Sequence, residues 1–127
     1  MKIAVLDDYL GYSQRFAEWG DLAQSVTVFD APIPAEDLAD TLRPFEVICV
    51  MRERTPIPVE SMEALPHLRL IVTTGPRNLS IDMVAAAARG LTVCGTGNRK
   101  AATAHLAMTL VLMAARKAAQ PERREAG

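Results

Sequence analysis

Short apolar runs rich in β-forming residues alternate along this chain with segments that carry helix signals, and this alternation restricts the fold more than any other feature. The runs are apolar on both faces, as strands buried in a parallel sheet are. They are Lys2 to Leu6, Ser25 to Phe29, Glu46 to Met51, Leu68 to Thr73 and Leu91 to Cys94. Right-handed crossovers between such strands need about a dozen residues each. The sequence therefore predicts an α/β fold: a flavodoxin-like three-layer sandwich with a five-stranded parallel sheet in the order 2-1-3-4-5.

Two segments between the predicted strands carry helix-end signals. Pro34 suits a first helical turn, the acids after it suit the dipole there, and Pro44 ends that helix. Ser80 to Asp82 opens a second helix, which ends at Gly90 because glycine adopts the left-handed cap conformation. A flavodoxin-like domain over residues 1–100 is expected, followed by a long helix over 101–119 and a frayed polar tail over 120–127.

The long C-terminal helix is apolar on more than one side. One stripe comprises Leu106, Leu110 and Met113, and another comprises Met108, Val111, Leu112 and Ala115. One sheet face cannot cover both stripes, so the helix predicts a homodimer or self-association, unless it packs entirely within its own domain. Its low-polarity stretch also falls short of the ~20 apolar residues that span a bilayer.

Bulk properties exclude several classes of function. Lys and Arg total 14 against 15 Asp and Glu, so the formal charge of -1 supplies no general field for nucleic acid or acidic membranes. The apolar run at the N-terminus ends at Asp7 and Asp8 and is too short for a secretory signal, so a cytoplasmic location is expected.

The two cysteines, Cys49 and Cys94, fall on the third and fifth predicted strands, roughly 9.6 Å apart at two strand spacings. They are predicted to be free, buried thiols, because disulfides need Cα atoms within about 7 Å.

Ligands of such sheets bind beyond the carboxyl ends of the strands. The loops after strands 3, 4 and 5 are Arg52 to Thr55, Thr74 to Asn78 and Gly95 to Lys100; they contain five of the 14 basic residues and one acid. Arginine can hold a carboxylate through two parallel hydrogen bonds, and Gly75 lets main-chain N–H groups approach it. These loops predict a cradle for a small carboxylate. The alternative is that the arginines form surface ion pairs with Asp7, Asp8 and Glu53.

Several segments carry a resemblance to a known family. They are Met51-Arg52-Glu53-Arg54-Thr55, Leu70-Ile71-Val72-Thr73-Thr74-Gly75-Pro76-Arg77-Asn78, Ile81-Asp82 and Leu91-Thr92-Val93-Cys94-Gly95-Thr96-Gly97. Over nearly its whole length the chain resembles the D-isomer-specific 2-hydroxyacid dehydrogenases. The resemblance implies a flavodoxin-like substrate domain, whose loop after strand 4 binds the carboxylate of a 2-hydroxy or 2-oxo acid through main-chain donors. The implied substrate-binding residues are Arg52, Thr74, Gly75, Pro76, Arg77 and Asn78.

The resemblance also implies an NAD(H)-binding Rossmann domain with a catalytic arginine, glutamate and histidine, none of which has a counterpart here. Gly95 to Lys100 comes closest to a dinucleotide loop, but Lys100 replaces the third small residue and no further strand follows. His67 is expected at the surface of the opposite edge, and His105 on the last helix, where the family has Glu. No catalytic, cofactor-binding or metal-ligating residue is predicted, and the chain alone should be inactive.

Two rival classes fit the same fold. A phospho-receiver domain also has an acidic pair after its first strand, like Asp7-Asp8, but it needs an acceptor aspartate at the end of the third strand, where Met51-Arg52 stands. The second rival is a stand-alone, non-catalytic module that binds a carboxylate or dimerises. It would need the same residues as the substrate domain of a dehydrogenase, so the residues alone do not separate the two. A Rossmann-coding stretch directly downstream would separate a piece of an enzyme from such a module.

Overall fold

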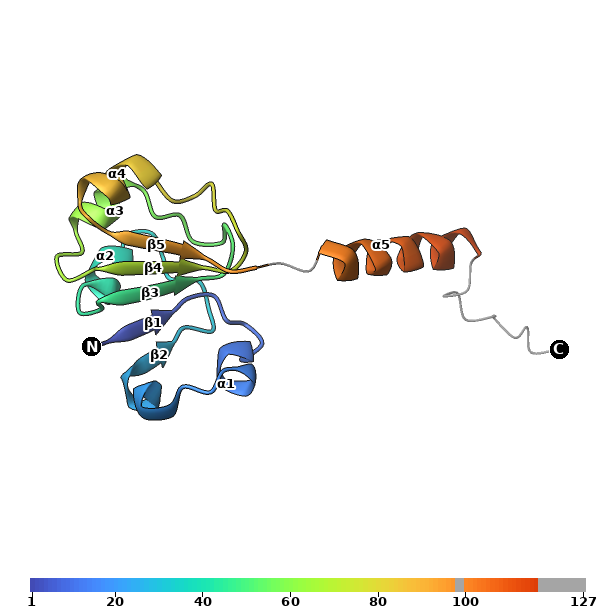
Figure 1. The fold of residues 1–127 in the computed structure, drawn as a ribbon, viewed down its shortest axis with the longest axis horizontal. Helices are drawn as coiled ribbons and strands as arrows, with labels where there is room; N and C mark the ends of the chain where they lie inside the picture. The colour runs from blue at the N-terminus through green and yellow to red at the C-terminus, as the bar shows by residue number, and fades with distance from the viewer. Residues whose placement is uncertain (98–99, 117–127) are drawn as a thin grey trace. The chain divides into compact units, whose positions relative to one another are not determined.

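The computed structural model describes residues 1–97 and 100–116. Five parallel strands form one sheet in the order β2-β1-β3-β4-β5, which confirms the predicted topology (Figure 1). The strands are shorter than the apolar runs that predicted them: β1 (Ile3–Val5), β2 (Val26–Val28), β3 (Val47–Val50), β4 (Leu70–Thr73) and β5 (Thr92–Gly95). Because the strands are parallel, the loops that follow them share one edge of the sheet, here called the carboxyl edge; the opposite edge is the amino edge.

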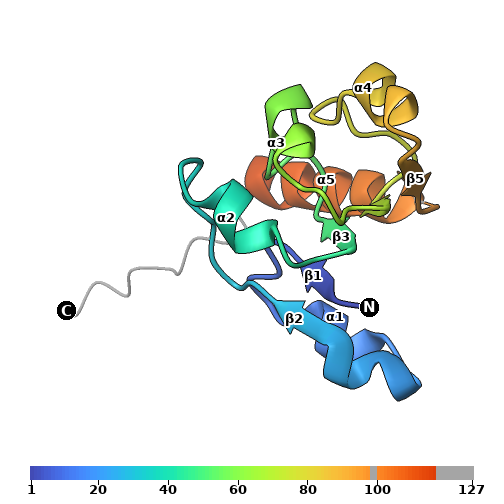
Figure 2. The ribbon, with the colours of Figure 1, turned by 90° about the vertical axis from the view of Figure 1, so that its left-hand side faces the viewer.

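One face of the sheet carries the hydrophobic core. Ala4, Ile48 and Ile71 form a row across β1, β3 and β4, and each is 0% exposed. Three helices cover this face in both ribbon views (Figures 1 and 2): α2 (Leu38–Leu42), α3 (Val59–Glu63) and α4 (Met83–Ala88). Their buried side chains Leu42, Met62 and Ala86 join the strand residues in one cluster. Burial of these apolar side chains holds the three helices on the sheet.

The other face of the sheet is covered less completely. Helix α1 (Tyr12–Phe16) lies on this side next to β1 and β2 (Figures 1 and 2), and a 3-10 turn, η1 (Gly20–Ser25), precedes β2. The register places Cys49, Val72 and Cys94 in one row on this face. Both thiols are free, as predicted, but Cys49 is half-buried and Cys94 is exposed. The prediction that both are buried was wrong, because Cys94 lies on the edge strand and points to the less covered face.

Of the two helices whose ends were predicted from local signals, one has the predicted ends and the other begins later than predicted. The Asp82 carboxylate accepts a hydrogen bond from the Ala85 N–H at the start of α4, and Gly90 has φ 69° just after its end, so this predicted helix is confirmed. The helix expected from Pro34 begins later. Pro34 instead opens a turn closed by the Asp37 N–H, which donates to the Pro34 carbonyl over 3.0 Å, and helical structure starts at Leu38. A single turn satisfies the prolyl carbonyl as well as a helix would.

The chain divides into two units, Met1–Gly97 and the segment from Asn98 onward, and each is described by itself. In the second unit, α5 (Lys100–Ala115) is the predicted long helix. Its large apolar residues are exposed: Leu106, Met108, Leu110, Val111, Leu112 and Met113. No helix among the described residues is long and apolar enough to cross a membrane. The predicted end of this helix beyond residue 116 and the polar tail 120–127 lie outside the described residues.

Candidate functional site

The loops after β3 and β4 are bound to each other at the carboxyl edge. The Arg52 N–H donates to Thr74 Oγ1 over 3.0 Å, and Asn78 Nδ2 donates to the Arg52 carbonyl over 2.6 Å. Asn78 also donates to Thr73 Oγ1 over 3.0 Å. Arg52 has φ 60°, a conformation that costs a non-glycine residue about 1–2 kcal/mol. These hydrogen bonds hold Arg52 in that conformation, as is common where strain serves a function.

Gly75 lies directly beside the Arg52 guanidinium. It has φ 100°, and a Cβ added there would stand 2.8 Å from Arg52 Nη1. A residue with a side chain would therefore push the guanidinium away. Arg52 and Gly75, two of the predicted site residues, are thus in contact through their side chain and main chain.

The main-chain donors of the β4 loop are only partly available. The Thr74 N–H donates to the Val50 carbonyl over 3.1 Å, and the Gly75 N–H donates to Thr96 Oγ1 over 2.8 Å. Pro76 has no N–H. The N–H groups of Arg77 and Asn78 donate no hydrogen bond within residues 1–97. A carboxylate at this loop would use those two groups, or replace the Thr96 hydroxyl as acceptor for Gly75.

Arg52, Arg54 and Arg77 do not form the ion pairs that were the alternative interpretation, while Arg99 lies outside the described residues. In the described part of the chain the ion pairs are Met1 with Glu46 and Arg43 with Asp40. The structure also separates two predicted residues. Arg52 lines a cavity next to β1, whereas Arg77 lines a smaller one, about 240 Å³, beside α4 and β5. The two arginines thus flank the β4 loop from different sides.

A second network at this edge was not predicted as a site. The buried Asp7 carboxylate accepts hydrogen bonds from Thr55 Oγ1 over 2.6 Å and from the Tyr9 hydroxyl over 3.0 Å. Arg54 Nη1 donates to the Asp7 carbonyl over 2.8 Å, and its guanidinium lies 4.7 Å from the Tyr9 ring centre. Burial, together with the hydrogen bond to Asp7 and the charge of that carboxylate, raises the pKa of Tyr9. This network joins the loops after β1 and β3.

Asp8 organises the start of α1. Its carboxylate accepts hydrogen bonds from the Tyr12 and Ser13 N–H groups, over 2.9 and 2.8 Å, and from the Ser13 hydroxyl over 2.6 Å. Burial disfavours the charged form, but these hydrogen bonds outweigh burial and hold the pKa of Asp8 below its usual value. Both acids of the Asp7-Asp8 pair are therefore engaged by their own chain. The described residues contain no cluster of His, Cys, Asp or Glu that could hold a metal ion.

Contacts within the chain account for the glycine that ends β5. A Cβ added at Gly95 would stand 2.7 Å from the Gly75 carbonyl oxygen, so contact within the chain accounts for this glycine. Asn98 and Arg99 lie outside the described residues.

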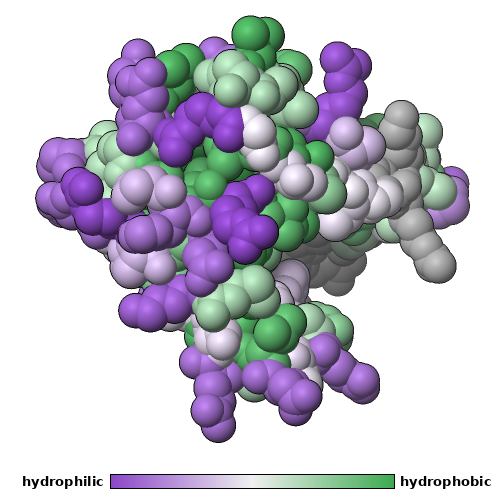
Figure 3. All heavy atoms as spheres, turned by 60° about the vertical axis from the view of Figure 1, so that its left-hand side comes forward, coloured by the Kyte–Doolittle hydropathy of each residue, from purple (hydrophilic) through white to green (hydrophobic). Residues whose placement is uncertain are grey.

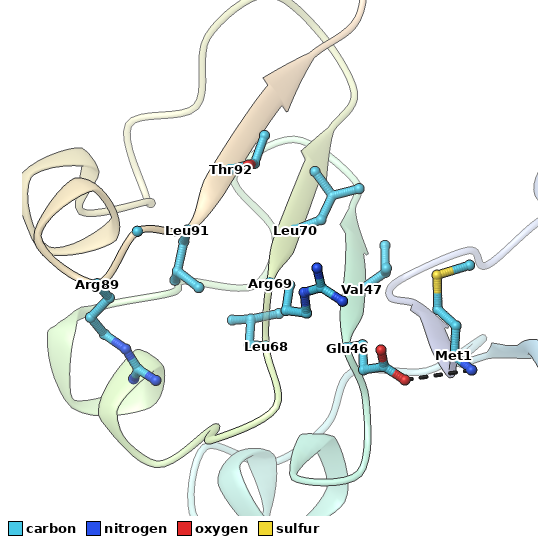
Figure 4. Close-up of a pocket in the computed structure, with 10 residues that line it drawn as sticks. Met1, Glu46, Val47, Leu68, Arg69, Leu70, Arg89, Leu91 and Thr92 are labelled. Atoms are coloured by element: carbon cyan, nitrogen blue, oxygen red, sulfur yellow. Dashed lines mark ion pairs between the residues drawn. The ribbon is translucent and has the colours of Figure 1, made fainter.

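A hollow of about 500 Å³ lies at the amino edge (Figure 4). Arg69 and Arg89 line it, and the N-terminal amine of Met1 pairs with Glu46 over 3.5 Å at its border. Figure 3, in which this edge is turned forward, shows hydrophilic side chains with hydrophobic patches between them. None of the predicted site residues lines this hollow. His67 is exposed, as predicted.

The five-stranded parallel sheet and the helices that flank it define an α/β domain of the flavodoxin-like class, with arginine- and glycine-bearing loops at its carboxyl edge. Residues 3–124 match the family described as D-isomer specific 2-hydroxyacid dehydrogenase, catalytic domain. The chain belongs to this family. A comparison with curated proteins finds no match.

Solved structures of dehydrogenases share the fold. A phosphoglycerate oxidoreductase from Vibrio cholerae O395 is 36% identical over 90% of this chain and 37% of its own, with a TM-score of 0.77. A Ralstonia solanacearum protein, provisionally described as a D-3-phosphoglycerate dehydrogenase, is 31% identical over 91% of this chain and 36% of its own, at 0.79. D-lactate dehydrogenase from Escherichia coli is 18% identical over 98% of this chain and 42% of its own, with a TM-score of 0.71. At this identity the similarity supports the fold alone. The chain thus spans less than half of the length of each of these proteins.

Proposed function

We propose that this chain is the substrate-binding lobe of an NAD-dependent D-2-hydroxyacid dehydrogenase and that it holds the carboxylate of a 2-hydroxy or 2-oxo acid. The observation that carries this proposal is the Arg52 guanidinium, which lies against Gly75 and pairs with no carboxylate among the described residues. A guanidinium binds a carboxylate through two parallel charge-assisted hydrogen bonds. The adjoining β4 loop would add the N–H groups of Arg77 and Asn78, and that of Gly75 where the carboxylate replaces the Thr96 hydroxyl as its acceptor.

The division of labour in the reaction follows from what this lobe contains. Hydride transfer from an alcohol needs a general base at the hydroxyl, and His67 lies near the start of β4, at the amino edge. NAD(H) supplies the hydride chemistry, and residues outside this chain bind it and supply the catalytic arginine, glutamate and histidine. This lobe binds the acid, fixes its carboxylate and presents its reacting carbon to the other domain. It has no dehydrogenase activity by itself.

A binding experiment tests the carboxylate site directly. Amide NMR titration of the 127-residue chain with oxamate, an unreactive analogue of pyruvate, should shift the signals of Arg52, Gly75 and Arg77. Arg52→Met should weaken binding by about ten- to a hundredfold, because a charged hydrogen-bond partner is lost. Arg43→Met, which removes an exposed arginine paired with Asp40, is the matched control and should bind as the wild type does. Equal affinity in the Arg52 variant would reject the site.

The proposed inactivity of the isolated chain has its own test. NADH oxidation with several 2-oxo acids should stay at the background rate, and calorimetry with NAD should show no heat of binding. Nucleotide binding by this chain would contradict the proposed division of labour.

The long helix is proposed to link the lobes and to pair two copies of the protein. Its exposed apolar residues occupy more than one side of α5, for example Leu106, Val111 and Leu112. Exposed apolar surface of this kind favours association. Light scattering should give twice the chain mass, and Val111→Glu should lower it to the monomer value. A monomer at high concentration would reject the dimer.

A further inference from the structure

A cavity of about 630 Å³ opens at the carboxyl end of β1, next to the carboxylate site. Its volume lies within the roughly 300–1,000 Å³ of small-molecule sites. The apolar part of its lining, here called the aromatic pocket, consists of Tyr9, Leu10, Tyr12, Phe16, Ala17 and Met51. Both tyrosines, the single tryptophan and one of the three phenylalanines of the chain lie between residues 9 and 19. Aromatic side chains are thus concentrated in the segment that follows β1.

The aromatic pocket leaves large apolar side chains in contact with water. Tyr12 is 51% exposed and Phe16 is 75% exposed. Their rings meet edge to face, with ring centres 5.6 Å apart, because the two residues lie one helical turn apart on α1. Asp8 fixes the start of this helix through its three hydrogen bonds. The rings are therefore held by the backbone in the open pocket.

The acidic groups of the pocket are already satisfied by the chain. The Asp7 carboxylate accepts hydrogen bonds from Thr55 and Tyr9, and the Asp8 carboxylate accepts them from the first residues of α1. Arg54 is bound to the Asp7 carbonyl and stacked on Tyr9. Arg52, by contrast, makes no ion pair in the parts of the chain that the structure describes. A ligand would meet two guanidinium groups, Arg52 and the already hydrogen-bonded and stacked Arg54, and apolar surface along the rest of the cavity.

Arg52 and Thr74 line this cavity and also belong to the carboxylate site. A single acid can therefore reach both: its carboxylate at Arg52 and Gly75, its side chain among Tyr9, Tyr12 and Phe16. We propose that the aromatic pocket is the side-chain subsite, and that the substrates are 2-hydroxy or 2-oxo acids with a large apolar or aromatic side chain. This inference rests on the proposed carboxylate site. It disfavours pyruvate-sized acids, which would leave the apolar lining uncovered, and phosphorylated acids, because Arg54 is already bound to the Asp7 carbonyl and stacked on Tyr9 and the rest of the lining beyond Arg52 is largely apolar.

The same titration of the full chain tests the subsite, with pyruvate, phenylpyruvate and a phosphorylated 2-hydroxy acid as probes. Phenylpyruvate should bind at least about tenfold more tightly than pyruvate, with ring-current shifts at Tyr12 and Phe16. Phe16→Ala and Tyr12→Ala should remove most of this preference, by weakening phenylpyruvate binding much more than pyruvate binding. Both side chains are exposed, so the variants should fold. Val84→Ala, which removes an exposed apolar side chain on α4, is the control and should change neither affinity.

The outcomes separate the two proposals. If every acid binds and Arg52→Met weakens all of them, but phenylpyruvate and pyruvate bind equally, the aromatic pocket is not the subsite and the carboxylate site stands. Tighter binding of the phosphorylated acid, or a phenylpyruvate preference that survives both alanine substitutions, also rejects the subsite. If no acid binds, both proposals fail together.

Discussion

The side-chain amide of Asn78 donates a hydrogen bond of 2.6 Å to the carbonyl oxygen of Arg52, across the two loops that build the candidate site. Its second donated bond, to Thr73 Oγ1, fixes the amide at the end of β4. Asn78 is only 8% exposed, so water replaces these bonds poorly. The conformation of Arg52 therefore depends on a residue 26 positions later in the chain.

Asn78→Asp should lower the free energy of unfolding by about 2–3 kcal/mol. The carboxylate keeps the acceptor that binds the Ser80 N–H, but it cannot donate to Arg52 or Thr73. Urea denaturation measures the change. Gln14→Glu makes the same chemical change at an exposed position of α1 and should alter stability by less than about 0.5 kcal/mol. Equal effects of the two substitutions would contradict the assigned role of Asn78.

Arg52→Gly and Asp7→Gly should change stability in opposite directions, although both residues have the same unusual backbone, with φ 60° and 59°. Glycine relieves about 1 kcal/mol of strain at either position. Arg52→Gly loses only an exposed side chain, so the protein should become more stable by roughly this amount while acid binding weakens. Asp7→Gly removes the acceptor for Thr55 and Tyr9 and should cost about 2 kcal/mol or more net. Thermal denaturation measures the change in stability of each variant. If both variants were more stable than the wild type, or both less stable, the interpretation would be rejected.

Asp8 should make part of the stability dependent on pH. Its folded-state pKa lies below the usual 3.8, so its charged form adds stability above about pH 4, and this is lost as the pH falls through the folded pKa. The wild type should therefore exceed Asp8→Asn in unfolding free energy at pH 6, and the difference should shrink below pH 3.8. Denaturation curves between these conditions test the sign. A gap that widens in acid would mean that the hydrogen bonds at α1 do not hold the charged form.

The two thiols should react at different rates. Cys94 is exposed, whereas burial raises the pKa of Cys49 and reduces its reactive thiolate. Iodoacetamide at pH 8 should modify Cys94 first, and Cys94→Ser should remove the fast phase. Val72 stands between the two cysteines in the sheet, so a non-reducing gel should show no internal bridge. A bridge would overturn the strand order.

Local signals predicted the parts of the fold that depend on neighbours in sequence. Asp82 and Gly90 mark the ends of α4 because a cap acts within one helical turn. Pro34 misplaced the start of α2, since a proline-led turn and a first helical turn have similar signals. The burial of Cys94 was misjudged because an apolar strand does not reveal which sheet face receives a covering helix.

The loops of the candidate site meet at the predicted edge of the sheet, whereas the arrangement of their side chains was not predicted, and their role as a binding site stays a prediction. Arg52 and Gly75 were expected to act together, and they are in contact. The placement of Arg77 in a different cavity, and the bond from Gly75 to Thr96, follow from the packing of loops that are distant in sequence. The cluster of Tyr9, Tyr12 and Phe16 was visible as an aromatic concentration after the first strand, but no motif marked it as a pocket.

The sequence by itself determined the strand order and the edge at which the arginine and glycine loops meet, because apolar runs and right-handed crossovers leave few parallel arrangements. Only the tertiary structure decided that Asn78 holds Arg52 in a strained conformation and that the rings of α1 open onto the same cavity. Those features depend on side-chain directions and hydrogen bonds between loops far apart in the chain, and no short-range pattern encodes them.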